Sequence, residues 1–345
     1  MQMPKVNINL AGLFGGGNKE CSCKEEHNIF DLTRDVVCYN QGKIAEYYFL
    51  HDKYQKELIA IMNRIYTSKD FSLIDELKNT YDKYNAIVSS ELNQIVQNNL
   101  EFSDKYFLNR RNTQARSCIK ILDKDLNVID PFRENDKKYK YNKNTGFQRL
   151  IDYNKSKNHY LCNNIPEAVA NNNYKNTRIK PECMKKYYKS LKPKNKIFTK
   201  LKKAIYDENQ KRIEAEWIEC WKGYGKNPPN HDDCYKSTLI IPMTFKNNSL
   251  SPEFISEIKM YQNSKDINTL GFLCFDHIEV DYFNSDKDIN FCYKIADLVS
   301  LFLLKDFISK SNKEYQFIEF LIESINKGKT PQELIENLEK TKKLK

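Results

Sequence analysis

The sequence predicts an α+β protein in which a hairpin of two helices precedes a domain of mixed helices and strands. Two strands carry most of this prediction. One is Ser237–Phe245, where Leu239, Ile241, Met243 and Phe245 share one face at period two. The other is Thr269–Asp276, which is apolar on both faces, as is typical of the centre of a covered sheet. The helical part rests on apolar side chains that recur every three or four residues between 29 and 104.

The composition is that of a globular protein with a real core. The chain has 345 residues, of which 40% are hydrophobic and 30% charged, enough for one large domain or two modest ones. Its formal net charge of +10 favours contact with something acidic without identifying it. No stretch approaches the roughly 20 apolar residues that span a bilayer. With no signal peptide and ten scattered cysteines, we expect reduced thiols and a cytoplasmic location.

The first 28 residues are expected to form a flexible tail, because Gly15, Gly16 and Gly17 lie ahead of a charged run. One alternative is a zinc site made by the cysteines and histidine of this region. A Cys-x-Cys spacing is too tight for the common zinc knuckle, so free thiols are favoured. The side chains concerned are Cys21, Cys23, His27 and Cys38.

Residues 29–104 are predicted to form the helical hairpin, which would act as a signalling helix pair. The first helix runs from Ile29 to Tyr66, and a second begins near Ser72. The second carries apolar residues at alternating steps of three and four, which form a seam for a partner helix. A matching stripe on the first helix favours an intramolecular hairpin. The alternative is a homodimer through helix 72–104.

The mixed domain is predicted to span 105–310 and to be followed by a helical tail at 311–345. Residues 115–122 and 128–129 have the pattern of two strands, and 144–154 that of a helix. A long polar loop follows, Asn163–Arg178, and loops of this length are often functional. The strongly apolar helix that begins at Ser285 is expected to pack on the sheet.

A basic insertion at 180–232 interrupts this domain. Residues 185–203 contain nine lysines, no acidic residue and three aromatic residues, a combination that can bind single-stranded nucleic acid. A solvated surface segment is favoured instead, because no recognised nucleic-acid motif accompanies it. The insertion ends with His231, Asp232, Asp233 and Cys234, which could supply metal ligands only with a further partner. A polar turn is the favoured interpretation, so no metal site is predicted.

The two signature strands and the helix after them resemble a GAF-type sensor domain over roughly residues 105–305. The features that carry the resemblance are Ile241-Pro242, Leu270-Gly271, Phe283 and the closing helix Ile289–Leu304. The resemblance implies an antiparallel sheet covered by helices, with a ligand pocket over one face beneath the Asn163–Arg178 loop. The Asn-Lys-Phe-Asp signature of cyclic-nucleotide-binding members is missing, so no ligand and no cofactor can be carried over.

The resemblance places seven residues at this pocket. Four polar side chains of the loop would orient a ligand: Asn164, Tyr174, Asn176 and Arg178. Three strand residues would form its floor: Thr244, Phe272 and Cys274.

A cytoplasmic regulatory protein that binds a small molecule and transmits the event to the N-terminal helices is therefore the favoured function. An enzyme is not favoured, because no nucleophile elbow, phosphate loop or paired-histidine motif is present. A thiol site would require Cys274 or Cys234 to act with His277 or His231. The remaining alternative is an interaction module that binds a partner protein or single-stranded nucleic acid through the basic insertion.

Overall fold

The computed structural model describes most of the chain. Its described residues are 19–123, 125–132, 138–152, 159–180, 214–222, 234–246, 251–252, 267–283 and 285–330. The predictions for residues 1–18, for the lysine-rich segment, for most of the helix between the two signature strands and for the last charged helix lie outside them. Of the described helices, none has an apolar stretch long enough to cross a membrane.

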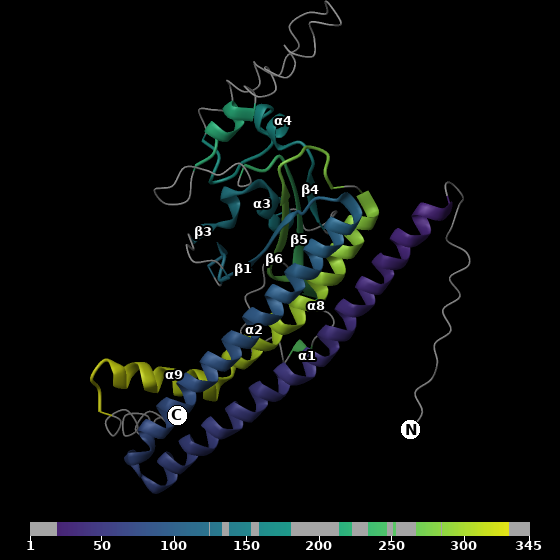
Figure 1. Cartoon of the computed structure of the whole chain (residues 1–345). Helices are drawn as coiled ribbons and strands as arrows, with labels where there is room; N and C mark the ends of the chain where they lie inside the picture. Colours follow the sequence, from purple (N-terminus) through teal and green to yellow (C-terminus); the bar gives the residue numbers. More distant parts are fainter. Residues whose placement is uncertain are drawn as a thin grey trace, which may run out of the picture.

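Two long helices form the predicted hairpin (Figure 1). Helix α1 spans Lys19–Ser68 and α2 spans Ile74–Arg111, joined by a short 3-10 turn at Phe71–Leu73. The first helix thus begins at Lys19 rather than at Ile29, inside the expected tail. The second ends later than predicted, at a left-handed Asn112 whose N–H bonds the Leu108 carbonyl.

The seam of α2 packs against α1 of the same chain. Its apolar side chains are buried there: Leu77, Tyr84, Val88, Leu92 and Ile95. One polar pair lies in this interface, since Asn40 and Asn99 exchange side-chain hydrogen bonds of 2.9 and 3.0 Å. These residues are covered within the chain, so a second copy would have to displace α1 to use them.

The six strands form one antiparallel sheet in the order β3-β2-β1-β6-β5-β4. The two signature strands are adjacent central strands, β5 (Ser237–Lys246) and β6 (Ile267–His277). The other four strands are β1 (Arg116–Leu122), β2 (Asn127–Ile129), β3 (Tyr139–Lys140) and β4 (Tyr160–Cys162). The α+β class with an antiparallel sheet is therefore confirmed.

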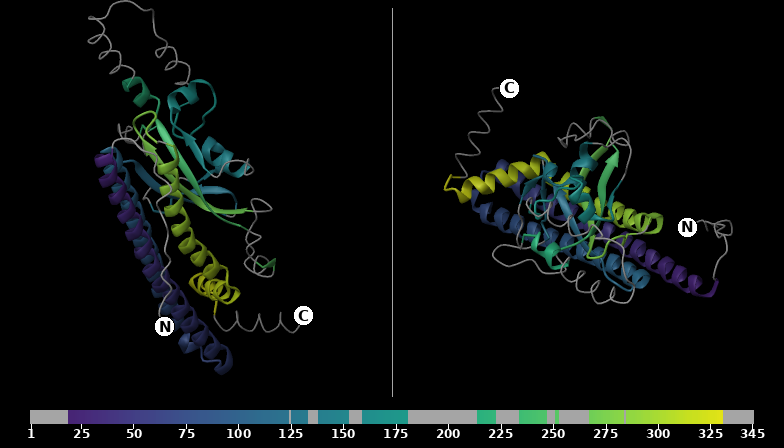
Figure 2. Two further views of the ribbon diagram at one scale, coloured as in Figure 1. Left: turned by 90° about the vertical axis from the view of Figure 1, so that its right-hand side faces the viewer. Right: turned by 90° about the horizontal axis from the view of Figure 1, so that it is seen from above.

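Both faces of the sheet are covered, as Figure 2 shows. We call inner the face that packs on α2 and on α8 (Ser285–Ser311), from which α9 (Lys313–Asn326) continues. Leu239, Ile241 and Met243 lie on this inner face, as their spacing predicts. The outer face carries Ile240, Phe272 and Cys274 and is covered by α3 (Thr145–Asp152), α4 (Ile165–Ala170) and a short helix at 214–219.

The centre of the sheet depends on one glycine. Gly271 on β6 pairs with Ile121 on β1, and a methyl group on Gly271 would overlap the carbonyl oxygen of Lys120. The two strands can approach this closely only because Gly271 has no side chain.

Candidate functional site

The structure brings most of the seven predicted site residues to the outer face of the sheet. Thr244, Phe272 and Cys274 share the strand face of Ile240, and the Asn163–Arg178 segment packs over that face through Ile165, Val169 and Tyr174. The segment therefore covers the face on which the pocket was expected.

The predicted floor residues are used in packing. The Phe272 ring lies 4.5 Å from the ring of Phe147, and both are buried. Cys274 lies opposite Cys118 on the neighbouring strand, and burial raises the pKa of its thiol well above the usual value. These side chains contribute to the core, so a ligand would reach them only by displacing it.

Asn164 has a local structural role. Its side-chain oxygen accepts a hydrogen bond of 3.1 Å from the Glu167 N–H and so caps the N-terminus of α4. The cap accounts for an asparagine at this position without a ligand.

The other three loop residues meet further aromatic and acidic side chains, and we call this group the outer cluster: Tyr174, Asn176, Arg178, Trp221, Tyr235 and Asp276. The Asn176 amide donates a hydrogen bond of 2.6 Å to the Tyr235 hydroxyl. The Arg178 guanidinium lies 5.5 Å from the Trp221 ring centre, and that ring lies 4.6 Å from the Tyr235 ring. The cluster thus combines flat apolar surfaces with hydrogen-bonding groups.

Trp221 presents an unused hydrogen-bond donor. The side chain is fully buried, and its indole N–H has no acceptor among the residues that the structure describes. A buried donor without a partner is costly, by about 1–3 kcal/mol, so a ligand or solvent acceptor at this position would be favoured.

Asp276 adds a titratable group to the cluster. Burial is the main cause that raises its pKa to about 6, while hydrogen bonding from Thr238 and the charge of Arg116 lower it. The hydroxyls of Tyr174 and Tyr235 also have raised pKa values, first because of burial and then because of the Asp276 charge. The charge of the Asp276 carboxylate therefore acts on both hydroxyls.

Sequence reasoning did not find Trp221, Tyr235 or Asp276 as site residues. For Asp276 a signal existed, since it is the one charged residue in the strand Thr269–Asp276, which is otherwise almost entirely apolar. The two aromatic residues carried no such signal, because their contacts with Asn176 and Arg178 join segments far apart in the chain.

Next to the outer cluster, on the inner face, lies a group that we call the junction: Tyr106, Arg110, Arg111, His277, Tyr282 and Asp288. The His277 ring stacks on Tyr282 with ring centres 3.5 Å apart, and Arg111 lies 5.4 Å from the Tyr282 ring. Asp288 at the start of α8 forms ion pairs with Arg110 and with Arg111, the latter at 3.2 Å. The junction therefore joins the end of α2 to β6 and α8.

The thiol site considered as an alternative from the sequence is not formed by Cys274 and His277, which lie on opposite faces of the sheet. Residues two apart on a strand share a face and neighbours do not, so Cys274 faces the outer layer while His277 faces the junction. Cys234 is buried in the outer layer, where its carbonyl accepts from Trp217. His231 lies outside the described residues.

The structure describes too little of the suggested metal ligands to place them. Within the described part of the chain, no group of three or more His, Cys, Asp or Glu side chains could hold a metal ion. Cys38 is exposed. The side chains of Cys21, Cys23, His27 and His231 lie outside that part.

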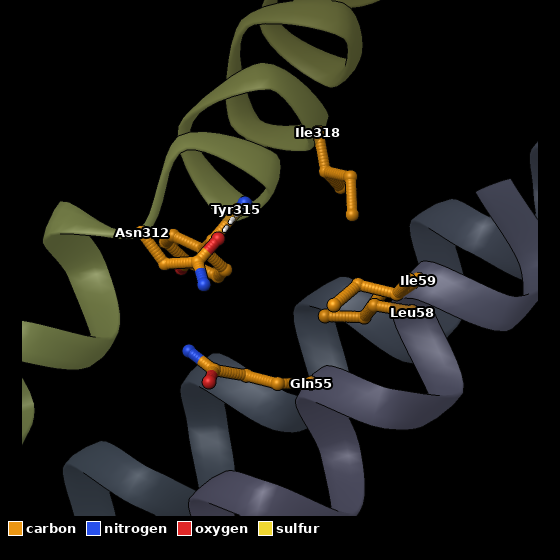
Figure 3. A pocket seen from close by; sticks show the side chains of 6 residues that line it. All are labelled: Gln55, Leu58, Ile59, Asn312, Tyr315 and Ile318. Atoms are coloured by element: carbon orange, nitrogen blue, oxygen red, sulfur yellow. Dashed lines mark hydrogen bonds between the residues drawn. The ribbon is translucent and has the colours of Figure 1, made fainter. Parts of the chain in front are cut away.

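A hollow of about 170 Å³, partly open to solvent, lies at a distance from the sheet, between α1 and α9 (Figure 3). Apolar side chains line one side of it and the polar ends of Gln55 and Asn312 the other. Its lining residues are Gln55, Leu58, Ile59, Asn312, Tyr315 and Ile318. This volume includes open solvent, and the hollow encloses no space that would hold even a water molecule, so it is not a ligand pocket.

Comparison with known protein families, with curated proteins and with solved structures finds no significant match. The function of the chain is therefore argued from its own residues.

Proposed function

We propose that the protein is a cytoplasmic regulatory protein that senses a small molecule at the outer cluster and transmits binding to the α1–α2 hairpin. The observation that carries the proposal is the position of two consecutive residues on β6. Asp276 faces the outer cluster, and His277 faces the junction with the end of α2. A displacement of this strand end would therefore move both groups together.

The chemistry of the outer cluster suits a flat, polar small molecule. Trp221 and Tyr235 contribute aromatic rings and Arg178 a positive charge, and the Trp221 N–H is a donor that has no acceptor among the described residues. A ligand with a hydrogen-bond acceptor beside an unsaturated ring would use all of them. The Asn163–Arg178 segment covers the sheet as the resemblance to a GAF-type domain implies, which adds support.

Transmission requires that the ligand bind two arrangements of the protein with different affinities. The junction supplies a contact that can differ between them. The Arg111 guanidinium lies over Tyr282, which stacks on His277, so a movement of β6 reaches α2 through packed side chains.

Thermal-shift screening of the full chain against nucleotides and small metabolites tests the binding step, because a ligand of the native state raises the melting temperature by mass action. The matched variant is Trp221→Phe, which removes the N–H and keeps an aromatic ring. We expect it to weaken binding about ten-fold, the value of one hydrogen bond. A ligand that binds Trp221→Phe equally well, or silence across a broad library, would contradict a site at this cluster.

Hydrogen exchange along α2 tests the transmission step. With ligand bound, we expect amides near Arg110 and Arg111 to change their protection. In Arg111→Gln, which lacks the charge over Tyr282, binding should persist while this change is lost. If the ligand binds and no amide of α2 changes its protection, the protein binds a ligand without transmitting the event, and the signalling role is refuted.

A further inference from the structure

Two cysteines face each other across the centre of the sheet. Cys118 on β1 is the register partner of Cys274 on β6, so the two residues lie directly opposite each other in an antiparallel pair. Both belong to the outer layer, where they are 5% and 3% exposed, and both side chains are thiols. The strand register therefore places two oxidisable groups side by side on one face of the sheet.

The geometry of such a pair suits a disulfide. Directly opposed residues of antiparallel strands have Cα atoms about 4.5 or 5.5 Å apart, depending on whether the pair is hydrogen-bonded. Disulfides join Cα atoms about 4.4–6.8 Å apart, so either kind of pair is suitable. The two thiols are already in contact, since a hydrogen bond joins their side chains. A bond between the sulfur atoms therefore requires little movement of the backbone.

A cation lies beside the two thiols. Lys120 follows Cys118 by two residues on β1, so both side chains point to the outer face. The Lys120 ammonium forms an ion pair of 2.9 Å with Asp130, and these two side chains are 19% and 11% exposed. The ion pair is therefore in contact with solvent, and a small polar oxidant can approach the thiols from this side.

Opposing effects act on the Cys274 thiol. Burial raises its pKa, and the neighbouring Cys118 raises it further, whereas the charge of Lys120 lowers it. A high pKa slows the reaction of a thiol with an oxidant, because the thiolate is the nucleophile. We therefore expect the pair to stay reduced under ordinary conditions and to react slowly, when an oxidant is in excess.

We propose that Cys118 and Cys274 are a site of reversible oxidation, at which hydrogen peroxide converts the two thiols into a disulfide between β1 and β6. One thiolate attacks a peroxide oxygen, the O–O bond breaks, and the departing oxygen takes up a proton and leaves as water. The sulfenic acid that results is attacked by the second thiol, so that the S–S bond forms and a second water leaves. Two thiols and one hydrogen peroxide thus give one disulfide and two waters.

The disulfide holds two strands together beside the outer cluster. Asp276 of that cluster lies two residues beyond Cys274 on β6 and so shares its face, and it is the register partner of Arg116 on β1. A bond between residues so far apart in the chain also restricts the unfolded state and thereby stabilises the fold. Oxidation requires no ligand at the outer cluster, so this site stands apart from the proposed sensing of a small molecule.

Peptide mapping of the full chain tests the proposal. The folded protein is incubated with hydrogen peroxide, the remaining thiols are blocked with N-ethylmaleimide, and an unreduced digest is analysed by mass spectrometry. We expect a linked pair of peptides that contain Cys118 and Cys274 and that separate after treatment with dithiothreitol. The link should be missing in Cys274→Ser. It should persist in the control Cys162→Ser, because Cys162 lies on β4 opposite Thr238.

Thermal melting of the wild-type chain shows whether the disulfide fits the native strands and depends on no variant. The oxidised protein should melt at least about 5 °C above the reduced protein, and dithiothreitol should reverse the shift. The proposal is overturned if Cys118 and Cys274 stay reduced under peroxide, if they become sulfinic or sulfonic acids, or if either pairs with another cysteine. A link that forms only in urea, or that does not raise the melting temperature, overturns it as well.

Discussion

The two faces of one sheet differ in how they are covered. The inner face is covered by α2 and α8, from the two ends of the chain, and its strand residues are largely aliphatic. The outer face is covered by the middle of the chain and is rich in aromatic rings, with Phe147, Trp217 and Trp221 all buried there. The same strands thus meet two layers of different chemistry.

The two faces also differ in how their polar side chains are paired. On the inner side, the charged groups lie at the edge of the layer and pair with one another, as Asp288 does with Arg110 and Arg111. On the outer side, the Trp221 N–H lies among aromatic rings and has no acceptor among the described residues. The inner face is built to hold helices, and the outer face keeps groups that a ligand could use.

Removal of the Asp288 carboxylate should lower the stability of the protein more than any other change considered below. Asp288→Ala leaves two arginines without their buried partner, so the free energy of unfolding in urea should fall by about 3–5 kcal/mol. Asp286→Ala, at an exposed position of the same helix, should cost at most about 1 kcal/mol. Equal losses for the two variants would mean that the junction does not hold the inner layer.

A change that forces β1 and β6 apart should have the next largest effect on stability. Gly271→Ala places a methyl group against the Lys120 carbonyl and should cost about 3 kcal/mol, the upper part of the range for overpacking. Gly42→Ala on α1 meets no atom within 4 Å and should stabilise the protein by about 0.5–1 kcal/mol. Urea denaturation measures both, and a Gly271→Ala protein as stable as wild type would show that the strands can shift.

The buried His51 of α1, whose Nδ1 shares a hydrogen bond of 2.7 Å with the Tyr84 hydroxyl, should make stability depend on pH on the acid side. Because the pKa of His51 is lowered to about 3 in the folded protein, the unfolded chain takes up a proton first as the pH falls below 6.5. Stability should therefore drop by about 2 kcal/mol between pH 6.5 and pH 5. In His51→Gln this part of the drop should be missing when melting curves are compared at the two pH values. If wild type and His51→Gln lose the same stability between the two pH values, the loss comes from groups other than His51.

The outer cluster should show the opposite pH dependence, through Asp276. The pKa of Asp276 is raised from 3.8 to about 6, so the folded protein binds this proton more tightly, and stability is lost as the pH rises between the two values. Asp276→Asn should therefore stabilise the protein by about 3 kcal/mol at pH 7 and by almost nothing near pH 3.5. A gain that is the same at both pH values would rule out titration of Asp276 as its cause.

The sheet could be predicted because its strands follow local rules. The alternation of Leu239, Ile241 and Met243 is enough to place a strand and assign its faces. The helices were found by their apolar periodicity, although their ends were not, since Lys19 and Arg111 lie beyond the apolar stripes. Local pattern thus identified elements better than boundaries.

The candidate site could be predicted only in part. The polar loop directed attention to Tyr174, Asn176 and Arg178, which do lie together. Phe272 and Cys274 were expected to be a pocket floor, yet a strand pattern cannot distinguish a floor from a core. Trp221 and Tyr235 reach the site through contacts that no local pattern contains.

The reciprocal pair of Asn40 and Asn99 limits how the hairpin can move. Each amide bonds the other across the two helices, and each also donates to a carbonyl of its own helix, Val36 or Ile95. A slide of one helix past the other by one turn would bury both amides against apolar side chains, at a cost of several kcal/mol. Tilting about this point breaks none of these bonds. The pair therefore opposes a slide of one helix past the other more strongly than a tilt about this point.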